Sequence, residues 1–341
     1  MNIAEHVSLK NLTTFKIGGN ARFFVAVKSV FELKAALVFA TNQNLNIFIL
    51  GGGSNVLISD NGIDGLVIKI EIEGIELNEL DNNRFELIAG AGESWDKLVE
   101  YSVQNGLYGL ENLSLIPGSV GAAPIQNIGA YGSEIKDTVL WVEAIDCTTG
   151  DFKRFSNEEC KFAYRDSFFK SSEGRNYIIT RVAFNLSRGG TVNISYKDIE
   201  NYIKTNLVHD ISLTSVRNMV IAIRTEKLPS LKEYGTAGSF FKNPIITKEK
   251  IYELRAKYPD IPSYPIVDST NFKTSAAWIL DNICGFKGFR EGNVGVYKNQ
   301  ALVLVNFGNA TAQEINALAE KMIASVKEKT EIILEKEIQI F

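Results

Sequence analysis

Two glycine-rich segments hold the residues whose types are best suited to binding a phosphate. The first, 51–55, reads GGGSN, and the second, 113–132, contains SLIPGSVGAAPIQNIGAYG. Clustered glycines allow backbone N–H groups to approach an anion, because no Cβ atom stands in the way. The second segment also carries Ser119, Gln126 and Asn127, whose polar groups can meet a ring edge and a pyrophosphate. Together the segments indicate a large planar ligand that carries a diphosphate.

The residues after the first segment decide what kind of nucleotide site it can form. A dinucleotide-binding turn of the Rossmann type needs a helix directly after its glycines, whose N-terminus meets the pyrophosphate. Here the chain continues VLIS over 56–59, which is typical of a strand. We therefore expect a flavin site of a different architecture. A tight hairpin without a ligand stays the alternative for this segment taken alone.

Short β-rich runs must position both segments. Strands are predicted in the first half at 22–27, 46–50, 54–59, 66–70, 85–89, 140–146 and 177–186, with helices at 31–40 and 94–104. Beyond about residue 210 helices dominate, at 213–227, 248–258, 276–284 and 312–329, with strands at 295–305 and 331–341. This change from a strand-rich to a helix-rich sequence predicts a domain boundary between 187 and 212.

Composition bounds the class of protein. The 341 residues suffice for two or three domains, and 45% hydrophobic with 22% charged residues is typical of a globular chain. A net charge of -4 argues against a general polyanion binder, so we expect no nucleic-acid partner. The N-terminus lacks a secretory pattern and no apolar run reaches spanning length, which predicts a cytoplasmic protein without membrane contact.

The cysteines and histidines form no metal or nucleophile pattern. Cys147, Cys160 and Cys284 lack metal-ligand spacing and are expected to be reduced and mostly buried. His6 and His209 are too few for a histidine-based metal site or a catalytic triad. We expect no metal.

Four motifs resemble those of one enzyme family. GGGSNVLISD, IPGSVGAAPIQNIGAYG, YRDSFF and GSFFKNP together resemble UDP-N-acetylenolpyruvoylglucosamine reductases (UDP-N-acetylmuramate dehydrogenases) of the longer, tyrosine-loop subtype, and the resemblance covers residues 12–341. It implies an α+β chain with a two-lobed FAD-binding domain of the vanillyl-alcohol-oxidase type over 1–210, whose core spans about 17–187. A smaller α+β substrate-binding domain over 211–341 would follow, with its final strand returning to the active site.

The resemblance also implies an activity, that of an oxidoreductase of peptidoglycan precursor synthesis acting on a CH–CH bond. NADPH would give hydride to FAD, and UDP-N-acetylglucosamine enolpyruvate would then take hydride and become UDP-N-acetylmuramate. FAD should be held without a covalent bond, because His6 lies at the extreme N-terminus and neither glycine segment contains a cysteine. These small molecules are the expected partners, and the chain is expected to be a monomer.

Three residues match the family's catalytic positions. Arg165, in YRDS, would hold the substrate carboxylate and counter the developing enolate with its planar guanidinium. Ser239, in GSFFK, would protonate the enolate carbon, which requires neighbours able to relay a proton. Glu335, in LEKE, would act as an acid or orient the enolate. Glu337 shares its face in the predicted strand, and the family pattern favours Glu335.

Without the motifs, these residues would have ordinary structural interpretations. Arg165 would form a surface ion pair, and Ser239 would be a turn or cap hydroxyl. Tyr196, in SYKDI, matches a tyrosine on a mobile loop that covers the nucleotide, and its alternative is an amphipathic-strand tyrosine.

The resemblance assigns the remaining binding residues. The predicted cofactor-binding residues are Gly51, Gly52, Gly53, Ser54, Asn55, Pro117, Gly118, Ser119, Gly121, Ala122, Gln126, Asn127, Gly129, Ala130 and Tyr131. The predicted substrate-binding residues are Tyr164, Tyr196, Lys227, Asn243 and Tyr264.

Two other functions stay open at this point. A flavin oxidase of the same fold would keep the glycine segments but has no use for the YRDS and GSFFK pair. A binding module that senses a nucleotide sugar or a flavin would bind its ligand without turnover.

Overall fold

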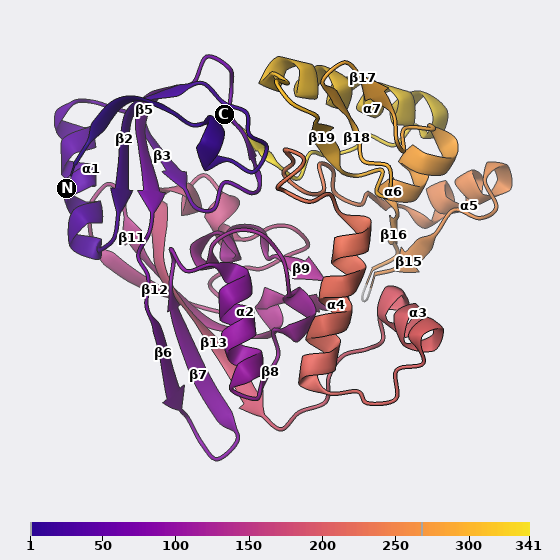
Figure 1. Cartoon of the computed structure of the whole chain (residues 1–341), viewed down its shortest axis with the longest axis horizontal. Coiled ribbons are helices and arrows are strands. Elements are labelled where there is room, and N and C mark those ends of the chain that lie inside the picture. Colours follow the sequence, from indigo (N-terminus) through magenta and orange to yellow (C-terminus); the bar gives the residue numbers. More distant parts are fainter. Residues whose placement is uncertain (1, 267–268) are drawn as a thin grey trace. The chain divides into compact units, whose positions relative to one another are not determined.

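The chain folds into two compact units, which a computed structural model describes over residues 2–266 and 269–341 (Figure 1). Unit 1 comprises the N-terminal residues up to Val7, then Ala21–Gly52 and Ile63–Thr225. Unit 2 comprises Ser8–Asn20, Gly53–Gly62 and the described part of Glu226–Phe341. Two N-terminal segments therefore belong with the C-terminal unit. The functional division into a FAD-binding domain over 1–210 and a substrate-binding domain over 211–341 stays a prediction.

The first sheet of unit 1 is built around a parallel core. Its strand order is β1-β2-β5-β3, and both β2 and β3 run parallel to β5. The strands are β1 (Ala4–Ser8), β2 (Asn20–Val27), β3 (Ile47–Leu50) and β5 (Ile63–Ile70). Helix α1 (Val30–Asn42) connects β2 to β3 and begins after Ser29, whose side chain accepts a hydrogen bond from the Glu32 N–H. Such a cap stabilises a helix by about 1 kcal/mol.

The second sheet of unit 1 is antiparallel. Its order is β12-β11-β13-β7-β6, with β8 also pairing with β13. The strands are β6 (Ile75–Glu79), β7 (Arg84–Gly90), β8 (Leu107–Tyr108), β11 (Val139–Asp146), β12 (Phe152–Ser156) and β13 (Tyr177–Arg188). Helix α2 (Trp95–Gln104) buries Trp95, Leu98 and Val99 in the same apolar cluster as β7 and β13. The Trp95 ring meets Phe184 of β13 edge-on at 5.8 Å between centroids.

Two further helices and a short hairpin complete unit 1. Helices α3 (Lys197–Asn206) and α4 (Leu213–Lys227) share a small apolar cluster of their own, in which Ile199 packs with Val216, Val220 and Ile223. The hairpin pairs β9 (Gly129–Ala130), in the second glycine-rich segment, with β10 (Ser133–Glu134), which directly follows that segment.

Unit 2 combines short strands with helices. Its sheets have the orders β14-β16-β15 and β17-β18-β19, and β20 runs parallel to β4. The strands are β4 (Val56–Leu57), β14 (Ile245–Ile246), β15 (Ser263–Pro265), β16 (Phe272–Thr274), β17 (Arg290–Glu291), β18 (Val294–Val296), β19 (Leu304–Asn306) and β20 (Gln339–Ile340). The helices are α5 (Lys248–Lys257), α6 (Ala276–Trp278) and α7 (Ala312–Thr330).

Helix α7 shows how the sequence sets a helix of unit 2. Thr311 and Glu314 form a reciprocal capping box at its start, which satisfies two backbone N–H groups. Ile315, Leu318 and Met322 recur on one face and are buried in the core of the unit. The sequence prediction of a helix at 312–329 is confirmed.

Several other predicted elements differ from the structure. Only Val56–Leu57 of the strand predicted at 54–59 forms, because the backbone bends through Ser54 and Asn55. The run 295–305 is a hairpin of β18 and β19, and 276–284 changes from α-helix to a π-helical turn over Ile279–Ile283. The final strand is short, with pairing at Gln339–Ile340 and one bridge between Lys336 and Phe241.

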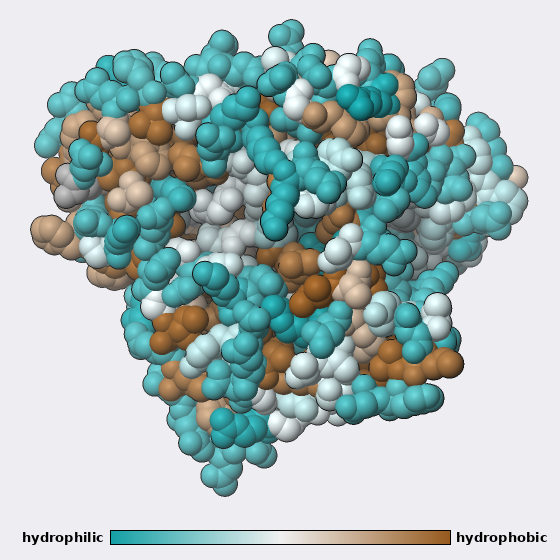
Figure 2. Space-filling view, viewed as in Figure 1, coloured by the Kyte–Doolittle hydropathy of each residue, from teal (hydrophilic) through white to brown (hydrophobic). Residues whose placement is uncertain are grey.

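Several large apolar side chains are exposed at the surface. Figure 2 shows one face on which hydrophilic residues predominate and hydrophobic ones are scattered. Phe31, Leu207 and Ile333 are examples of exposed apolar side chains, and single residues of this kind are normal on a protein surface. Within the described ranges, no helix is long and apolar enough to cross a membrane.

Candidate functional site

The two glycine-rich segments approach each other closely in unit 1. A Cβ atom on Gly51 would lie 2.4 Å from the Ser119 Oγ, and one on Gly52 would lie 2.8 Å from the Gly118 Cα. The backbone contact at Gly52 leaves no room for a Cβ, whereas at Gly51 the Ser119 hydroxyl would have to rotate away. The structure thereby brings together the two segments that the sequence assigned to one ligand. Their apposed backbones form the kind of glycine cradle that a flavin diphosphate requires.

The first segment continues into a strand, as the sequence predicted. Beyond the bend at 51–55 the chain enters β4, so no helix follows the glycines. The unit boundary falls between Gly52 and Gly53. In unit 2, Gly53 has φ of +63° and a Cβ there would lie 2.1 Å from the Leu12 carbonyl oxygen. The Asn55 amide donates to the Glu337 carbonyl at 3.4 Å, which ties this segment to the C-terminal residues.

The second segment is laid against the start of α2 by backbone hydrogen bonds. The Trp95 N–H donates to the Gly118 carbonyl at 3.1 Å, and the Val120 and Gly121 N–H groups donate to the Glu93 and Ala91 carbonyls, each at 2.9 Å. A Cβ on Gly121 would lie 2.6 Å from the Ala91 Cβ. Pro117, Ala122, Gln126 and Ala130 belong to the same loop and its short turns.

Asn127 is an internal support of this loop. Its side chain is fully buried, and its amide nitrogen donates to the Glu134 carboxylate and the Ala163 carbonyl, each at 2.9 Å. Its amide oxygen accepts from the Lys136 N–H at 3.1 Å. Both N–H bonds of the amide are therefore used within the protein. Its predicted contact with a cofactor stays a prediction, and the structure gives it a role in joining the loop to the segment before Arg165.

Arg165 is anchored to the second glycine segment. Its Nη2 donates to the Gly129 carbonyl at 2.7 Å, and its guanidinium carbon lies 5.4 Å from the centre of the Tyr164 ring. The Lys170 ammonium donates to the Arg165 carbonyl at 3.1 Å. Arg165 itself has φ of 53°, in the left-handed region that is unfavourable for a residue with a side chain. The structure thus places the predicted catalytic arginine beside the predicted cofactor loop.

Left-handed residues gather in this part of unit 1. Leu115, Asn127, Tyr131 and Arg165 have φ of 58°, 45°, 50° and 53°. Each costs about 1–2 kcal/mol relative to ordinary backbone, and such strain persists only where the surroundings enforce it. Conformations of this kind are concentrated at ligand-binding sites in proteins.

Tyr196 lies against the end of the same segment. It is the residue immediately before α3, so the alternative of a strand tyrosine is wrong. Its ring is 43% exposed and meets the Tyr131 ring edge-on at 5.4 Å between centroids. Burial raises the pKa of Tyr131 to about 12, and Arg224, whose side chain hydrogen-bonds the hydroxyl, opposes that rise.

Ser239 and Glu335 lie on neighbouring extended segments of unit 2. Ser239 forms a bridge with Val303, and two residues later Phe241 forms one with Lys336. The Lys242 N–H donates to the Glu335 carbonyl at 2.9 Å, and the Lys242 ammonium donates to the Glu335 carboxylate at 2.5 Å. The Glu335 side chain is 70% exposed and that of Lys242 only 15%. Glu335 is thus an accessible carboxylate held by a nearly buried cation.

The remaining predicted substrate residues are distributed over unit 2. Lys227 is the last residue of α4. The Asn243 side-chain oxygen accepts from the Ala276 N–H at 3.0 Å and so caps α6. Tyr264 is 53% exposed in β15, beside Lys273 of β16. Lys227 therefore ends the helix that leads into unit 2, and Asn243 and Tyr264 lie at or near the sheet β14-β16-β15.

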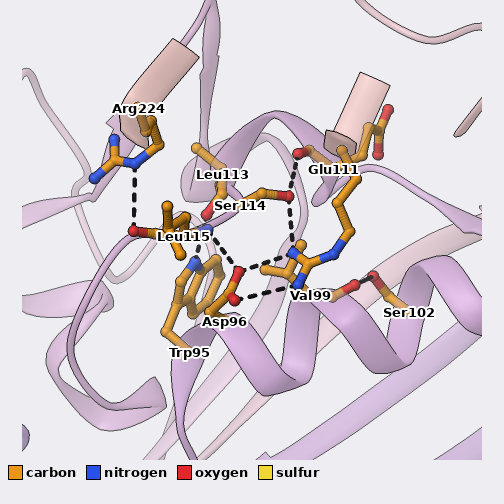
Figure 3. A network of polar contacts seen from close by, with 10 residues as sticks. Trp95, Asp96, Val99, Ser102, Glu111, Leu113, Ser114, Leu115 and Arg224 are labelled. Carbon is orange, nitrogen blue, oxygen red and sulfur yellow. Dashed lines mark hydrogen bonds and ion pairs between the residues drawn. The ribbon is translucent and has the colours of Figure 1, made fainter. Parts of the chain in front are cut away.

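Sequence reasoning missed four polar residues of this region. Lys242 lies inside the GSFFKNP motif but was not assigned a role. Asp96 and Arg224 bond Leu115 near the start of the second glycine segment (Figure 3), and Arg217 bonds Asp96 and Ser114. A usable signal was the spacing of Arg217 and Arg224, two turns apart on one face of α4, with Arg217 among the apolar positions Val216 and Val220.

The cysteines are protonated thiols at ordinary pH. Cys160 is buried, and this burial raises its pKa to about 12. Cys147 and Cys284 are half-buried, and burial raises the pKa of each. The described residues contain no group of three His, Cys, Asp or Glu side chains arranged to hold a metal ion.

Comparisons with known proteins agree with the two halves of this description. Residues 21–156 match the family profile described as an FAD binding domain. Residues 230–341 match the profile described as the C-terminal domain of UDP-N-acetylenolpyruvoylglucosamine reductase. The predicted fold class, a FAD-binding domain followed by a smaller α+β domain, is confirmed.

Individual relatives match along the whole chain. A UDP-N-acetylenolpyruvoylglucosamine reductase of Flavobacterium johnsoniae is 46% identical over 341 residues, which is 100% of both chains. That of Pseudomonas putida is 41% identical over 337 residues, covering 99% of this chain and 98% of the relative. The crystal structure of the reductase from Thermus caldophilus matches with a TM-score of 0.70 at 26% identity, covering 100% of this chain and 99% of that one. The tyrosine-loop subtype stays a prediction, but the chain belongs to the UDP-N-acetylenolpyruvoylglucosamine reductase family.

Proposed function

We propose that this chain reduces UDP-N-acetylglucosamine enolpyruvate to UDP-N-acetylmuramate, using bound FAD and NADPH. The observation that carries the proposal is the hydrogen bond from Arg165 to the Gly129 carbonyl at 2.7 Å. It fixes a guanidinium suited to a carboxylate and an enolate on the loop that is assigned to the flavin. A flavin oxidase or a sensor has no need of that arrangement.

The glycine cradle supports the binding of FAD. Gly52 approaches the Gly118 backbone too closely for any side chain, and Gly51 lies against the Ser119 hydroxyl, which leaves backbone N–H groups to meet the diphosphate. When bound, FAD supplies hydride transfer, taking hydride from NADPH and giving it to the vinyl carbon of the substrate. The other assigned cofactor residues of 51–55 and 117–131 would line the same ligand.

Arg165 would bind and orient the enolpyruvyl carboxylate. Hydride arriving at the vinyl group leaves negative charge on the adjoining carbon and the carboxylate. A guanidinium offers two parallel N–H bonds to a carboxylate, and a donor placed before the reaction stabilises the charge as it develops. Its bond to Gly129 and its contact with Tyr164 hold the fork in one orientation.

Ser239 and Glu335 would complete the reaction on the enolate. The Ser239 hydroxyl is proposed to deliver the proton to carbon, and it needs a neighbour that replaces or stabilises that proton. Glu335 is the proposed orienting or acidic group, and Lys242 holds its carboxylate at 2.5 Å. Lys242 would therefore act as a positioning residue for Glu335.

The nucleotide part of the substrate is assigned to Tyr196, Lys227, Asn243 and Tyr264. Tyr196 and Tyr264 offer partly exposed rings, at 43% and 53%, and Lys227 offers a cation for a diphosphate. We place the enzyme in the cytoplasm as a monomer, in keeping with small-molecule substrates and the absence of a spanning helix among the described residues.

An anaerobic two-step experiment tests this function. The purified protein is mixed with NADPH until the flavin absorbance bleaches, and UDP-N-acetylglucosamine enolpyruvate is then added. Prompt return of the absorbance, with UDP-N-acetylmuramate as product, is expected. A flavin that stays bleached until air is admitted would indicate an oxidase. A protein that binds no flavin would refute the assignment of the glycine segments.

A further inference from the structure

Leu115 adopts an unfavourable backbone conformation just before the predicted cofactor loop begins at Pro117. Its φ is 58°, a left-handed value that costs a residue with a side chain about 1–2 kcal/mol. The Leu115 side chain is 37% exposed, so burial of that side chain does not account for the conformation. Contacts to its backbone must enforce it instead.

Side chains from two helices hold both backbone groups of Leu115. The Leu115 N–H donates to the Asp96 Oδ1 at 2.5 Å, and the Leu115 carbonyl accepts from the Arg224 Nε at 3.3 Å. Figure 3 shows Asp96 and Arg224 reaching this residue from opposite sides, one from α2 and the other from α4. We call Asp96, Arg217 and Arg224 the Leu115 clamp.

Arg217 fixes the carboxylate of the clamp. Its Nη1 and Nη2 donate to the two Asp96 oxygens at 2.8 and 3.1 Å, and its Nη1 also donates to the Ser114 Oγ at 3.0 Å. The Arg217 side chain is 9% exposed and that of Asp96 is 29% exposed. Although burial alone would raise it, the Arg217 guanidinium and the Leu115 N–H keep the pKa of Asp96 below its ordinary value.

The Asp96–Arg217 ion pair, with Arg217 nearly buried and Asp96 partly buried, has a structural effect beyond its contribution to stability. Desolvation of the two charges offsets most of their attraction, so an apolar pair of similar volume would stabilise the fold about as well. A charged pair does, however, specify one geometry, because both oxygens and both terminal nitrogens must be matched. The geometry specified here is that of residues 114 and 115.

The clamp acts directly upstream of the glycine cradle. Three residues after Leu115, Gly118 meets Gly52, and Ser119 meets Gly51. The same helix start that provides Asp96 also provides the Trp95 N–H, which donates to the Gly118 carbonyl at 3.1 Å. One rigid element therefore sets both Leu115 and Gly118, so the direction in which the loop leaves Leu115 is fixed from two points.

We propose that the Leu115 clamp consists of positioning residues that hold the cofactor loop in its binding conformation before FAD arrives. The inference rests on the proposed use of the glycine cradle for FAD and adds to it residues outside the predicted cofactor-binding set. Without the clamp, Leu115 relaxes to ordinary backbone and the loop has to be reordered on binding. The cost appears as weaker FAD binding.

The test measures FAD affinity in the full-length protein. Holoenzyme is diluted and the rise of flavin fluorescence is followed, and deflavinated protein is titrated with FAD. Asp96→Asn, which keeps an acceptor oxygen but loses the charge, and Arg217→Lys, which keeps the charge but loses the fork, should each weaken FAD binding by about tenfold. Thermal unfolding of the deflavinated variants establishes that they are folded.

Asp81→Asn is the matched control. Asp81 also accepts hydrogen bonds from backbone N–H groups, those of Asn83 and Arg84, and pairs with the Arg84 guanidinium at 2.7 Å. It lies in the turn between β6 and β7, away from both glycine segments in sequence and sheet position. Its replacement should leave FAD affinity within about twofold of the parent value.

A double-mutant cycle with Leu115→Gly separates positioning from general destabilisation. Glycine adopts a φ of 58° without the Cβ penalty, so residue 115 would keep this conformation with less help from the clamp. Asp96→Asn should then weaken FAD binding by less than about threefold in the Leu115→Gly background, against about tenfold in the parent. An equal loss in both backgrounds, or a loss as large for Asp81→Asn, would overturn the inference.

The same data separate this inference from the proposed function. If the parent protein binds no FAD, the function proposed above fails. If the parent binds FAD and both clamp variants bind it equally well, only the role of the clamp is refuted.

Discussion

The cofactor loop of unit 1 and the segment 238–242 of unit 2 differ in how far their polar groups are bonded within the protein or left accessible. In unit 1, the Asn127 amide of the loop and the Asp96 carboxylate of α2 beside it are committed to partners within the protein. In unit 2, the Glu335 carboxylate is 70% exposed and is held by the single ammonium of Lys242. The loop is built to keep its shape, and the unit 2 segment leaves its reacting groups accessible.

Backbone strain follows the same contrast. In and beside the cofactor loop the left-handed positions include Leu115, Asn127, Tyr131 and Arg165, and side chains hydrogen-bond the backbone of Leu115, Tyr131 and Arg165. In unit 2 the residue before Ser239 is Gly238, with φ of 75°, where glycine adopts the conformation freely. A large ligand needs a fixed shape, whereas a proton donor needs room to move. Variants in the two regions should therefore fail differently.

Ser239→Ala should produce the largest effect and leave cofactor binding intact. Flavin reduction by NADPH should be nearly unchanged, while product formation slows by about 10²–10⁴, because a general acid is removed from the second half-reaction alone. Stopped-flow absorbance under anaerobic conditions measures the two halves separately. Equal losses in both halves would remove Ser239 from the assigned role.

Arg165→Lys should come next. The ammonium keeps the positive charge but cannot form two parallel bonds to a carboxylate, and it cannot reproduce the bond to Gly129 together with them. We expect the oxidative half-reaction to slow by about 10²–10³, the loss typical for a donor that stabilises developing negative charge. Near-normal turnover by this variant would exclude the guanidinium from the mechanism.

Gly52→Ala should break the cofactor loop without touching unit 2. The new Cβ would lie 2.8 Å from the Gly118 Cα, so one backbone must shift. We expect FAD affinity to fall by about ten- to a hundredfold, in line with the cost of overpacking. Gly150→Ala is the control, because its φ of 74° also disfavours a side chain but nothing lies within 4 Å of a Cβ there. Retention of FAD by Gly52→Ala would contradict the cradle.

The contrast between the regions also explains what the sequence could and could not predict. Glycine spacing identified the cradle, because two backbones can approach closely only where glycine is present. Hydrophobic periodicity predicted α4 and α7 to within a residue. The family resemblance supplied Arg165, Ser239 and Glu335, which composition and spacing alone would have left as ordinary surface residues.

The missed features depend on long-range pairing. A carboxylate at a helix start is favoured by the helix dipole alone, yet the main partner of Asp96 is Arg217, 121 residues further along the chain. The final strand was predicted over 331–341, but its pairing depends on where segments 55–57 and 240–242 lie. No local pattern reports such partners. The inclusion of residues 8–20 and 53–62 in unit 2 is missed for the same reason.

Lys242→Met should have a moderate effect restricted to unit 2 chemistry. Without its ammonium the Glu335 carboxylate loses its partner, and the second half-reaction should slow by about fivefold while FAD affinity stays unchanged. Lys336→Met is a close control, because the neighbouring ammonium binds Glu320 and Asn316 instead, each at 2.7 Å. Equal effects on turnover from the two lysines would show that Glu335 does not depend on Lys242.

The smallest expected effect is the pH dependence of the Asp96 contribution to stability. The folded state lowers the pKa of Asp96 from its ordinary value of 3.8, so the unfolded chain binds the proton more tightly. Its stabilising contribution is therefore complete above about pH 5 and disappears as pH falls through the folded pKa.

Asp96→Asn should lower the free energy of unfolding by about 1 kcal/mol at neutral pH, a loss typical for one charge-assisted hydrogen bond. Urea titrations at a series of pH values should show the difference between parent and variant shrinking below about pH 4. A difference that stays constant or grows in acid would mean that the Asp96 carboxylate is not held by Arg217 and the Leu115 N–H in solution, and the contrast between a prearranged loop and an open catalytic segment would lose its main support.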